Sequence, residues 1–451
     1  MRKLLFSAVL MLVASVGIAS AADRPNLLIM MTDDQRADAL SCAGNPVLRT
    51  PNLDRIAGEG ARFRNMFVTN ALCAPSRATL LTGLYSHSHG VTDNRGRIVP
   101  QSIPMVSDLL RKAGYEVAFC GKSHQGNALR DREWDHYFGY RGQGNYLKPM
   151  VAEGTKGKDL PRDGWMDDVI TDDAIAWMKQ PHEKPFAMFL FFKAPHRSWT
   201  PPPRHKDLFN NVTIPLPKLW DADRNAKTQA FAKADNRIGD FADVKDFQSY
   251  VKDYYRTIVG VDDNVGKVFA ALEANKQLDS TAILFTSDNG FFQGEWKAFD
   301  KRFMHEPSIR VPLLMRYPAK IKAGSLIDPM VLNVDIAPTL LDLAGLPVPE
   351  SMQGRSVVPL FAGTPADWRK DWLYEYFEYP AEHNVRKHRG VRTDTHKLIH
   401  YYESPEEWEL YDLSKDPDEL HNLYRKPGME ALTTQLKQRI VDLRKQTNDR
   451  D

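Results

Sequence analysis

A cysteine and an arginine stand on either side of a Pro-Ser pair, at the point where an apolar helical pattern begins. The segment reads Ala71-Leu72-Cys73-Ala74-Pro75-Ser76-Arg77-Ala78-Thr79-Leu80-Leu81-Thr82-Gly83. A thiol at the start of a helix lies near the positive end of the helix dipole, here beside a fixed guanidinium. This position suits either a nucleophile or a modified side chain that meets an anion.

Two adjacent carboxylates follow the first predicted strand. The apolar run at 26–31 predicts a parallel strand buried on both faces, and it ends in Thr32-Asp33-Asp34-Gln35. A helix cap needs one carboxylate, and the second would be repelled by it unless a positive group lies beside the pair. The pair therefore favours a functional role, and the alternative is a cap with a solvated neighbour.

Three further predicted strands end in polar side chains. Gly121-Lys122-Ser123-His124 comes after the strand at 115–119, Lys193-Ala194-Pro195-His196 after the strand at 186–192, and Ser287-Asp288-Asn289-Gly290 after the strand at 282–286. Ligands of open α/β sheets bind outside the carboxyl ends of the strands. The four strand ends together predict one site; the alternative is a set of unrelated caps and surface acids.

The acidic and amide side chains at these strand ends offer only oxygen to a metal. Oxygen ligands favour a hard divalent cation, Ca²⁺ or Mg²⁺, over zinc or copper. The predicted metal ligands are Asp33, Asp34, Asp288 and Asn289.

A second group of side chains is cationic or donates hydrogen bonds. Together with a metal, such groups make an electrostatic clamp for a tetrahedral oxyanion. The group consists of Arg77, Lys122, His124, His196 and Lys301. Sulfate esters and phosphate esters fit this clamp equally well.

The alternation of strands and helices predicts an α/β fold. We expect a large, mostly parallel sheet sandwiched by helices. Aromatic alternating strands at 372–377 and 397–402, with a terminal helix at about 428–445, predict a smaller C-terminal α+β sub-domain that carries an antiparallel sheet. The predicted organisation is a signal peptide at 1–22, a catalytic domain at 23–364 and the sub-domain at 365–451.

The N-terminus has the features of a secretory signal. Arg2 and Lys3 precede an apolar stretch at 4–18, and Ala19-Ser20-Ala21 is similar to a cleavage site. Removing the two basic residues lowers Lys+Arg from 60 to 58, which equals the 58 Asp+Glu residues. We therefore expect an exported protein, periplasmic or secreted, without a nucleic-acid partner.

The rest of the chain predicts neither a membrane span nor a disulfide framework. It contains no later apolar run of about 20 residues. An exported chain with three cysteines, Cys42, Cys73 and Cys120, forms one disulfide at most. An odd cysteine is left to be explained.

The pentapeptide Cys73-Ala74-Pro75-Ser76-Arg77 resembles the C-x-P-S-R signature of type I sulfatases, which belong to the alkaline phosphatase superfamily. Further segments resemble motifs of that family in the family's order: 32–35, 121–124, 194–196, 286–290, 301–302, 308–313, 335–339 and 409–413. The resemblance covers about residues 25–425. It implies an alkaline-phosphatase-like fold and a hydrolase that acts on sulfate esters.

The resemblance also implies a role for each matched residue. Cys73, oxidised to formylglycine by a sulfatase-maturating enzyme, is the nucleophile and a further ligand of a Ca²⁺ ion held by Asp33, Asp34, Asp288 and Asn289. Arg77 holds the hydrated aldehyde, and Lys122, Lys301 and His196 hold the sulfate. His196 protonates the leaving alcohol, and His124 assists the release of sulfate.

The substrate that the resemblance implies is a sulfated carbohydrate. The segment 290–316 is most similar to bacterial carbohydrate sulfatases, including those that act on 6-O-sulfated N-acetylglucosamine. Ser123, Trp296 and His305 depart from the residues of many relatives, which leaves the shape of the pocket open. His383 and His388 are predicted substrate contacts, against the alternative of a solvated basic loop. The alternative functions are a phosphomonoesterase or phosphodiesterase of the same fold and a non-catalytic glycan-binding relative.

Overall fold

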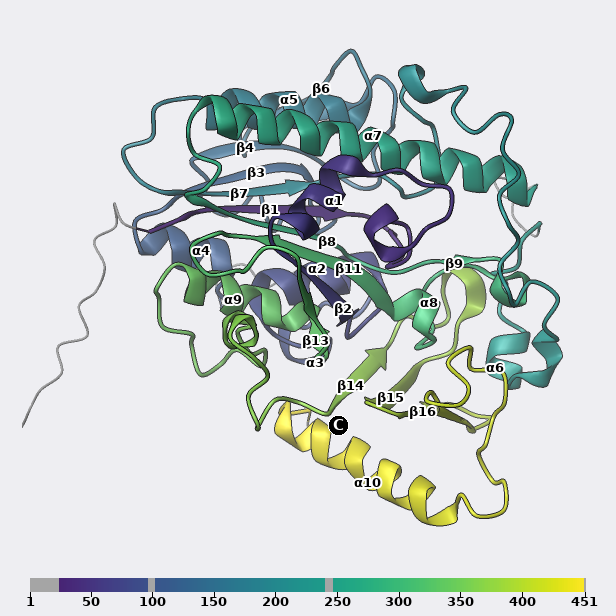
Figure 1. The fold of residues 1–451 in the computed structure, drawn as a ribbon. Helices are drawn as coiled ribbons and strands as arrows, with labels where there is room; N and C mark the ends of the chain where they lie inside the picture. The colour runs from purple at the N-terminus through teal and green to yellow at the C-terminus, as the bar shows by residue number, and fades with distance from the viewer. Residues whose placement is uncertain (1–23, 96–101, 240–245, 450–451) are drawn as a thin grey trace, which may run out of the picture.

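A large mixed sheet runs through the molecule (Figure 1). The computed structural model describes residues 24–95, 102–239 and 246–449, so the predicted signal peptide lies outside the described residues. Within these ranges the main sheet has 11 strands in the order β12-β2-β11-β8-β1-β7-β3-β4-β5-β6, with β13 paired to β2. The strands are β1 (Asn26–Thr32), β2 (Ala61–Phe67), β3 (Glu116–Lys122), β4 (His136–Tyr140), β5 (Met150–Glu153), β6 (Asp159–Pro161), β7 (Phe186–Phe191), β8 (Thr281–Ser287), β11 (Arg310–Arg316), β12 (Ser325–Ile327) and β13 (Val331–Leu332).

The centre of the sheet is parallel, as predicted. Strands β8, β1, β7, β3 and β4 all run in the same direction, whereas β11 is antiparallel to both β8 and β2. Successive side chains of a strand point to opposite faces. Accordingly, Leu27, Ile29 and Met31 enter the core on one face of the sheet, and Leu28 and Met30 enter the core on the other.

Helices cover both faces of the main sheet (Figure 1). One face carries α1 (Pro51–Gly58), α5 (Met166–Met178) and α7 (Phe247–Ala274), and α7 contacts both of the others. The other face carries α2 (Cys73–Thr82), α3 (Ser86–His89), α4 (Val106–Lys112) and α9 (Ile336–Leu343). Two short helices, α6 (Gln229–Ala232) and α8 (Glu306–Ile309), lie in connecting segments. No helix of the described residues combines the length and the apolar character that crossing a membrane requires.

A second, smaller sheet follows in the C-terminal part of the chain. It is fully antiparallel and has the order β14 (Asp371–Tyr376), β15 (His388–Thr393), β16 (His396–Tyr401) and β17 (Glu407–Asp412). The final helix α10 (Glu430–Gln446) packs on β14, β15 and β16. The predicted antiparallel sheet and terminal helix are thus confirmed.

Some elements differ from the sequence pattern. Helix α4 covers only Val106–Lys112, and α5 begins at Met166. Strands β5 and β6 extend the sheet at its edge, where most side chains are exposed or half-buried and leave no apolar run to recognise. A two-stranded sheet, β9 (Phe292–Gln293) with β10 (Phe299–Asp300), shapes the segment before Lys301.

Candidate active site

Cys73 is the first residue of helix α2, and every residue of this helix is buried. Gly83 ends the helix in the left-handed conformation (φ 68°) and donates its N–H to the Thr79 carbonyl. The side chain of Asn333 holds the first turn by donating to Ser76 Oγ at 3.0 Å. The thiol therefore has a fixed place at the positive end of the helix.

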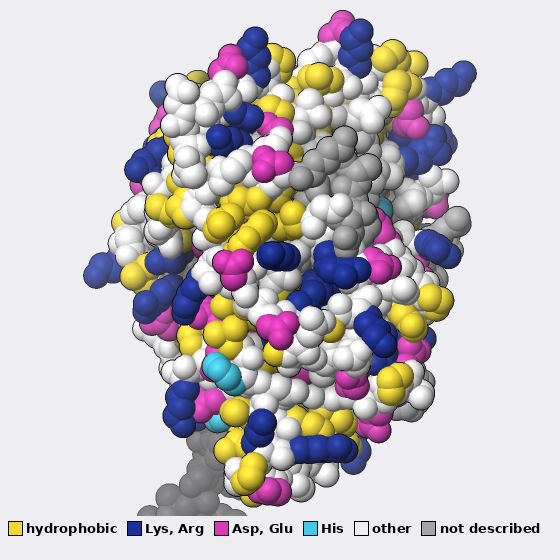
Figure 2. Space-filling model, turned by 90° about the vertical axis from the view of Figure 1, so that its right-hand side faces the viewer, with side chains coloured by type: hydrophobic (Ala, Val, Ile, Leu, Met, Phe, Trp, Pro, Cys, Tyr) yellow, Lys and Arg dark blue, Asp and Glu magenta, His cyan; other side chains and the backbone are white. Residues whose placement is uncertain are grey.

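The strand ends predicted from the sequence do meet. Strands β8, β1, β7 and β3 are consecutive in the sheet and parallel, so their carboxyl ends lie at one edge. The face beyond this edge looks toward the viewer in Figure 2, where basic and acidic side chains are mixed. Ligand atoms of Asp33, Asp34, Cys73 and Asp288 all lie within 4.8 Å of one another.

The carboxylates of this cluster are fully enclosed. Asp33, Asp34 and Asp288 are at most 1% exposed. Burial, together with the charges of Asp33 and Asp288, raises the pKa of Asp34 to about 7 against the attraction of Lys301. Burial also acts to raise the pKa of Asp33, but Lys122 and other nearby cations hold it well below its usual range. Burial and the charge of Asp33 raise the pKa of Asp288.

These residues fit a hard divalent cation. Three buried carboxylates repel one another, and a cation between them would offset that repulsion. Asn289 Oδ1 is buried without a hydrogen-bond partner, as expected of an oxygen kept for a ligand. The amide nitrogen of Asn289 lies 3.0 Å from Asp288 Oδ1 and 3.5 Å from Cys73 Sγ, which places Asn289 inside the cluster.

Arg77 connects three parts of the site. Its guanidinium donates to Asp288 Oδ2 at 2.7 Å, to Asp33 Oδ2 at 3.0 Å and to the Lys122 carbonyl at 2.5 Å. The side chain has no exposed surface. Because a guanidinium presents several donors in a fixed plane, one residue ties the ends of β1, β8 and β3 to helix α2.

Two lysines complete the positive lining. Lys122 Nζ donates to Asp33 Oδ2 and to Gln143 Oε1, and Lys301 Nζ donates to Asp34 Oδ2 at 2.6 Å. Burial lowers the pKa of Lys301, but Asp300 and Asp34 outweigh that effect and raise it well above its usual range. Lys301 is therefore charged in the folded protein.

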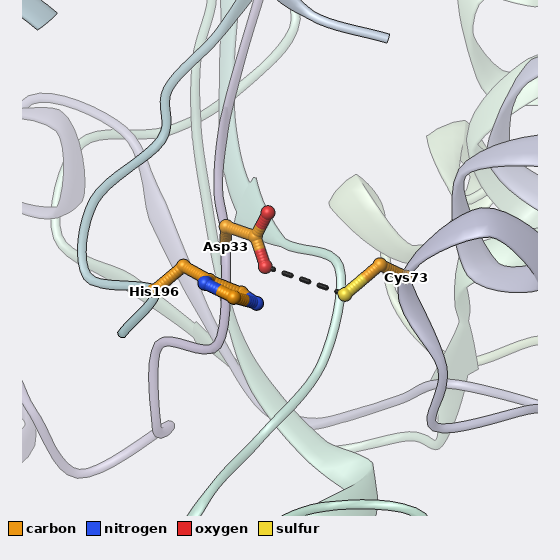
Figure 3. Close-up of side chains that lie close together, drawn as sticks. All are labelled: Asp33, Cys73 and His196. Atoms are coloured by element: carbon orange, nitrogen blue, oxygen red, sulfur yellow. Dashed lines mark hydrogen bonds between the residues drawn. The ribbon is translucent and has the colours of Figure 1, made fainter. Parts of the chain in front are cut away.

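His196 lies next to Asp33, and a ring nitrogen is within 4.8 Å of Cys73 Sγ. Figure 3 shows it beside Asp33 and Cys73, whose Sγ lies 3.5 Å from Asp33 Oδ1. His196 Nδ1 lies 2.5 Å from the Arg197 carbonyl oxygen, and Nε2 lies 3.8 Å from Asp34 Oδ2. Burial and Lys122 hold the pKa of His196 well below its usual range. The ring thus donates from Nδ1, and Nε2 faces the site.

His124 is the one predicted site histidine that stays half-exposed. It follows β3 in the left-handed conformation (φ 50°), and its Nδ1 is buried without a hydrogen-bond partner. Burial and Lys122 hold its pKa well below the usual range.

The two predicted substrate contacts are not on a solvated loop. His388 is fully buried and packs against Tyr374, Tyr376 and Tyr401, with its Nδ1 2.8 Å from the Arg386 carbonyl. The ring is enclosed by tyrosine side chains and is not among the groups that meet at Cys73, so a substrate contact of His388 stays a prediction. His383 is also buried, with Nε2 2.9 Å from Asp300 Oδ2. It contacts the segment that carries Lys301, and its contact with a substrate also stays a prediction.

Several polar residues next to the site were not predicted. Asn94 Oδ1 accepts from the Ala74 N–H at 3.2 Å, and Gln143 holds Lys122. Asp167 accepts the backbone N–H groups of Lys193 and Ala194 at 2.8 and 2.9 Å, which fixes the turn after β7. Asn94 and Gln143 belong to segments without apolar periodicity, so no local pattern marks them. Asp300, adjacent to Lys301, is a charged neighbour that could have been recognised.

Comparison with protein families assigns most of the chain. Residues 25–346 match the sulfatase family, and residues 294–446 match the family described as N-sulphoglucosamine sulphohydrolase, C-terminal. The mixed sheet covered by helices, with the cluster at the carboxyl ends of its strands, agrees with a protein of the sulfatase class. The chain therefore belongs to the sulfatase family, whose members hydrolyse sulfate esters.

Individual relatives agree with this assignment. The chain is 38% identical to an N-acetylglucosamine-6-O-sulfatase of Bacteroides thetaiotaomicron, over 99% of this chain and 92% of the relative. It is 30% identical to the N-acetylglucosamine-6-sulfatase of Homo sapiens, over 80% of this chain and 68% of the relative. A solved structure of a protein in complex with its substrate, D-glucosamine-2-N,6-O-disulfate, superposes with a TM-score of 0.89 and 38% identity, covering 95% of this chain and 99% of that one.

Proposed function

We propose that this sulfatase removes a 6-O-sulfate group from a glucosamine-type sugar, such as N-acetylglucosamine, within a sulfated carbohydrate. One observation carries the proposal. Cys73 lies at the start of a buried helix, inside a cluster of three carboxylates and beside two lysines and an arginine. The N-acetylglucosamine-6-O-sulfatase relative, similar along almost the whole chain, supports the choice of sugar.

The metal and the modified cysteine are parts of this proposal. A Ca²⁺ ion would be held by Asp33, Asp34, Asp288 and Asn289 together with residue 73, and when bound it would polarise a sulfate oxygen. After two-electron oxidation by a sulfatase-maturating enzyme and hydration, residue 73 would supply a geminal diol, in which one hydroxyl attacks sulfur and the other allows sulfate to leave by elimination.

The positive side chains bind the sulfate group. Lys122 and Lys301 are buried ammonium donors that already face the carboxylate cluster, and the negative charge of a sulfate oxygen would attract them. Arg77 holds the helix start against the metal ligands and so fixes the direction of residue 73. These three residues orient the ester and stabilise the charge that grows on its oxygens.

The histidines move protons. His196 donates from Nδ1 to a backbone carbonyl, which leaves Nε2 to carry the proton for the departing sugar oxygen. An anionic sulfate ester beside the ring favours the protonated imidazolium that this role requires. His124, beside Lys122, is the proposed base for sulfate release.

The proposed test combines turnover with mass spectrometry. We expect protein produced with a maturating enzyme to release sulfate from 6-O-sulfated N-acetylglucosamine faster than it releases phosphate from the matching 6-phosphate. The peptide that contains residue 73 should be about 18 Da lighter than the cysteine form, from the chemistry of the oxidation. Cys73→Ala should lose turnover. Faster phosphate release, or full activity with an intact thiol, would contradict the proposal.

The place of action is also a proposal. The basic residues, apolar stretch and small-residue site at 1–22 support export to the periplasm or the medium. Fractionation of producing cells, followed by N-terminal sequencing of the mature protein, tests this proposal. Intact residues 1–22 on protein retained in the cytoplasm would contradict it.

A further inference from the structure

A second cluster of possible metal ligands lies on the opposite face of the sheet from helix α2. Cys120 belongs to β3, His136 is the first residue of β4, and Asp173 comes from helix α5, which covers both strands. In the parallel pairing of β3 with β4, Ala118 is opposite His136 and Cys120 is opposite Phe138. Cys120 and His136 are thus two register positions apart, and their side chains point to the same face.

The three side chains meet at one carboxylate oxygen. Asp173 Oδ2 lies 2.6 Å from His136 Nε2 and 3.5 Å from Cys120 Sγ. A sulfur, a nitrogen and an oxygen from this trio all lie within 4.8 Å of one another. Tetrahedral zinc, with bonds of about 2.0 Å to nitrogen or oxygen and about 2.3 Å to sulfur, keeps its ligand atoms roughly 3.3 to 3.6 Å apart. Cys120 Sγ already lies at that spacing from Asp173 Oδ2, and a movement of Asp173 by less than about 1 Å would bring its oxygen to that spacing from His136 Nε2.

The surroundings suit a bound ion. Trp177 stacks on the His136 ring, with centroids 5.9 Å apart and planes at 19°, and so restricts its rotation. Cys120 is fully buried, whereas the side chains of His136 and Asp173 are 20% and 22% exposed. The ring and the carboxylate leave an entry path for the ion and room for a water as fourth ligand.

We propose that Cys120, His136 and Asp173 form a zinc site, separate from the catalytic cluster. Its mixed sulfur, nitrogen and oxygen donors select zinc over calcium, in contrast to the oxygen-rich set around Asp33. Without metal, the Cys120 thiol and the His136 Nε2–H each donate a hydrogen bond to Asp173. Zinc replaces both contacts: the thiol releases its proton to solvent, and the neutral ring changes tautomer by exchange with solvent, so that Nδ1 carries the proton and Nε2 is free to bind the metal.

The test measures zinc bound to the full-length, metal-stripped protein in saturating Ca²⁺. All proteins carry Cys73→Ala, so that zinc has no thiolate to bind in the catalytic cluster. We expect about one zinc ion per chain, and an affinity at least tenfold lower in Cys120→Ser and in His136→Gln, from the loss of a single ligand. Cys42→Ser, which removes a cysteine remote from the cluster, is the matched control and should bind zinc as before.

Cobalt substitution gives a second readout, which does not depend on the stability of a variant. Co²⁺ bound to the parent protein should show thiolate-to-cobalt charge-transfer absorption, and Cys120→Ser should lack it. Asp173→Asn should weaken binding and retain the absorption. Zinc binding unchanged by Cys120→Ser, absence of zinc binding in the parent, or cobalt binding without thiolate absorption would each overturn the proposal.

Discussion

His383 Nε2 lies 2.9 Å from Asp300 Oδ2, and this contact joins the C-terminal part of the chain to the segment that positions Lys301. Asp300 Oδ1 lies 3.4 Å from Lys301 Nζ, which in turn donates to Asp34. A histidine far along the chain thus supports a lysine of the candidate site through one aspartate. From these contacts we predict that His383 supports the site by positioning Lys301.

Replacing His383 by Gln should therefore reduce activity without abolishing it. We expect kcat/KM to fall by about tenfold, a loss of about 1.4 kcal/mol in transition-state binding, because Asp300 would hold Lys301 less firmly. Steady-state kinetics on a sulfated sugar measure the effect. His421→Gln, at a position that is 77% exposed, is the control. Equal kinetics of the two variants would contradict the positioning role.

Replacing Arg77 by Lys should reduce activity more than replacing His383 by Gln. A lysine keeps the charge but cannot reach Asp288, Asp33 and the Lys122 carbonyl at once. We expect kcat/KM to fall by at least 100-fold, or about 2.7 kcal/mol. Arg55→Lys, at a surface ion pair with Glu59, should change kcat/KM by less than about twofold. The prediction fails if Arg77→Lys keeps a tenth or more of the activity.

Removing divalent metal should destabilise the fold as well as stop turnover. The buried carboxylates of Asp33, Asp34 and Asp288 repel one another without a cation between them. We expect chelation to lower the melting temperature by roughly 3 °C, if the metal is present at about 100 times its Kd before chelation. Added Ca²⁺ should restore both properties. In Asp288→Asn, which lacks one proposed ligand, chelator should change the melting temperature far less. If chelator lowered the melting temperature of this variant as much as that of the parent, the proposed metal site would be contradicted.

Asp262 should make the stability of the fold depend on pH, independently of the cluster around Cys73. It accepts from the Leu53 N–H at 2.8 Å and from Asn52 Nδ2 at 3.0 Å, which ties α7 to α1. Burial raises its pKa to about 6. The folded state therefore holds a proton that the unfolded state has already lost, and the stability from this group falls as the pH rises from about 4 through about 6.

Asp262→Asn should remove this pH dependence. The substitution changes the free energy of unfolding by some amount at pH 4. At pH 7 the free energy of unfolding of the variant, measured relative to the parent, should be up to about 3 kcal/mol higher than at pH 4. Urea unfolding at both pH values measures the difference. Asp172→Asn, with a side chain that is 65% exposed, is the control. If the difference in free energy of unfolding between Asp262→Asn and the parent were the same at both pH values, Asp262 would not be the source of the pH dependence.

Gly121, next to Lys122, should tolerate no side chain. Its φ is +113°, and a Cβ would lie 1.9 Å from the Phe191 carbonyl oxygen. Gly114 has a similar φ of +96° with nothing within 4 Å of a Cβ. Gly114→Ala should lower the free energy of unfolding by about 1–2 kcal/mol, from backbone strain alone. Gly121→Ala should lower it by more than about 4 kcal/mol, or the variant should fail to fold. Similar unfolding free energies for the two variants would contradict the close approach of β3 and β7.

The meeting of side chains at the strand ends could be predicted because its signals are local and repeated. Asp33, Lys122, His196 and Asp288 each follow a buried strand, and the rule that ligands bind at the carboxyl ends of parallel strands brings them together. The central strands themselves are apolar runs buried on both faces, which makes them recognisable. The antiparallel edge strands β5 and β6 are largely exposed and carry no comparable pattern.

The histidines of the C-terminal part could not be placed from sequence. Between residues 382 and 388 the chain reads as polar and basic, and only the pairing of β15 between β14 and β16 encloses His388 in tyrosine rings. The supporting residues Asn94 and Gln143 depend on long-range contacts of the same kind. A charge pattern can indicate that a segment is near a site, but the pairing of distant strands decides which side chains lie beside it.

The burial of helix α2 sets the order of events in the biogenesis of the enzyme. No residue from Cys73 to Thr82 is exposed, and Cys73 itself has no accessible surface. A second protein cannot enclose this cysteine in its own catalytic pocket once the helix is packed beneath the sheet. If Cys73 is oxidised to formylglycine as proposed, the maturating enzyme must meet it on the nascent or still unfolded polypeptide, so the rate of folding limits the time available for activation.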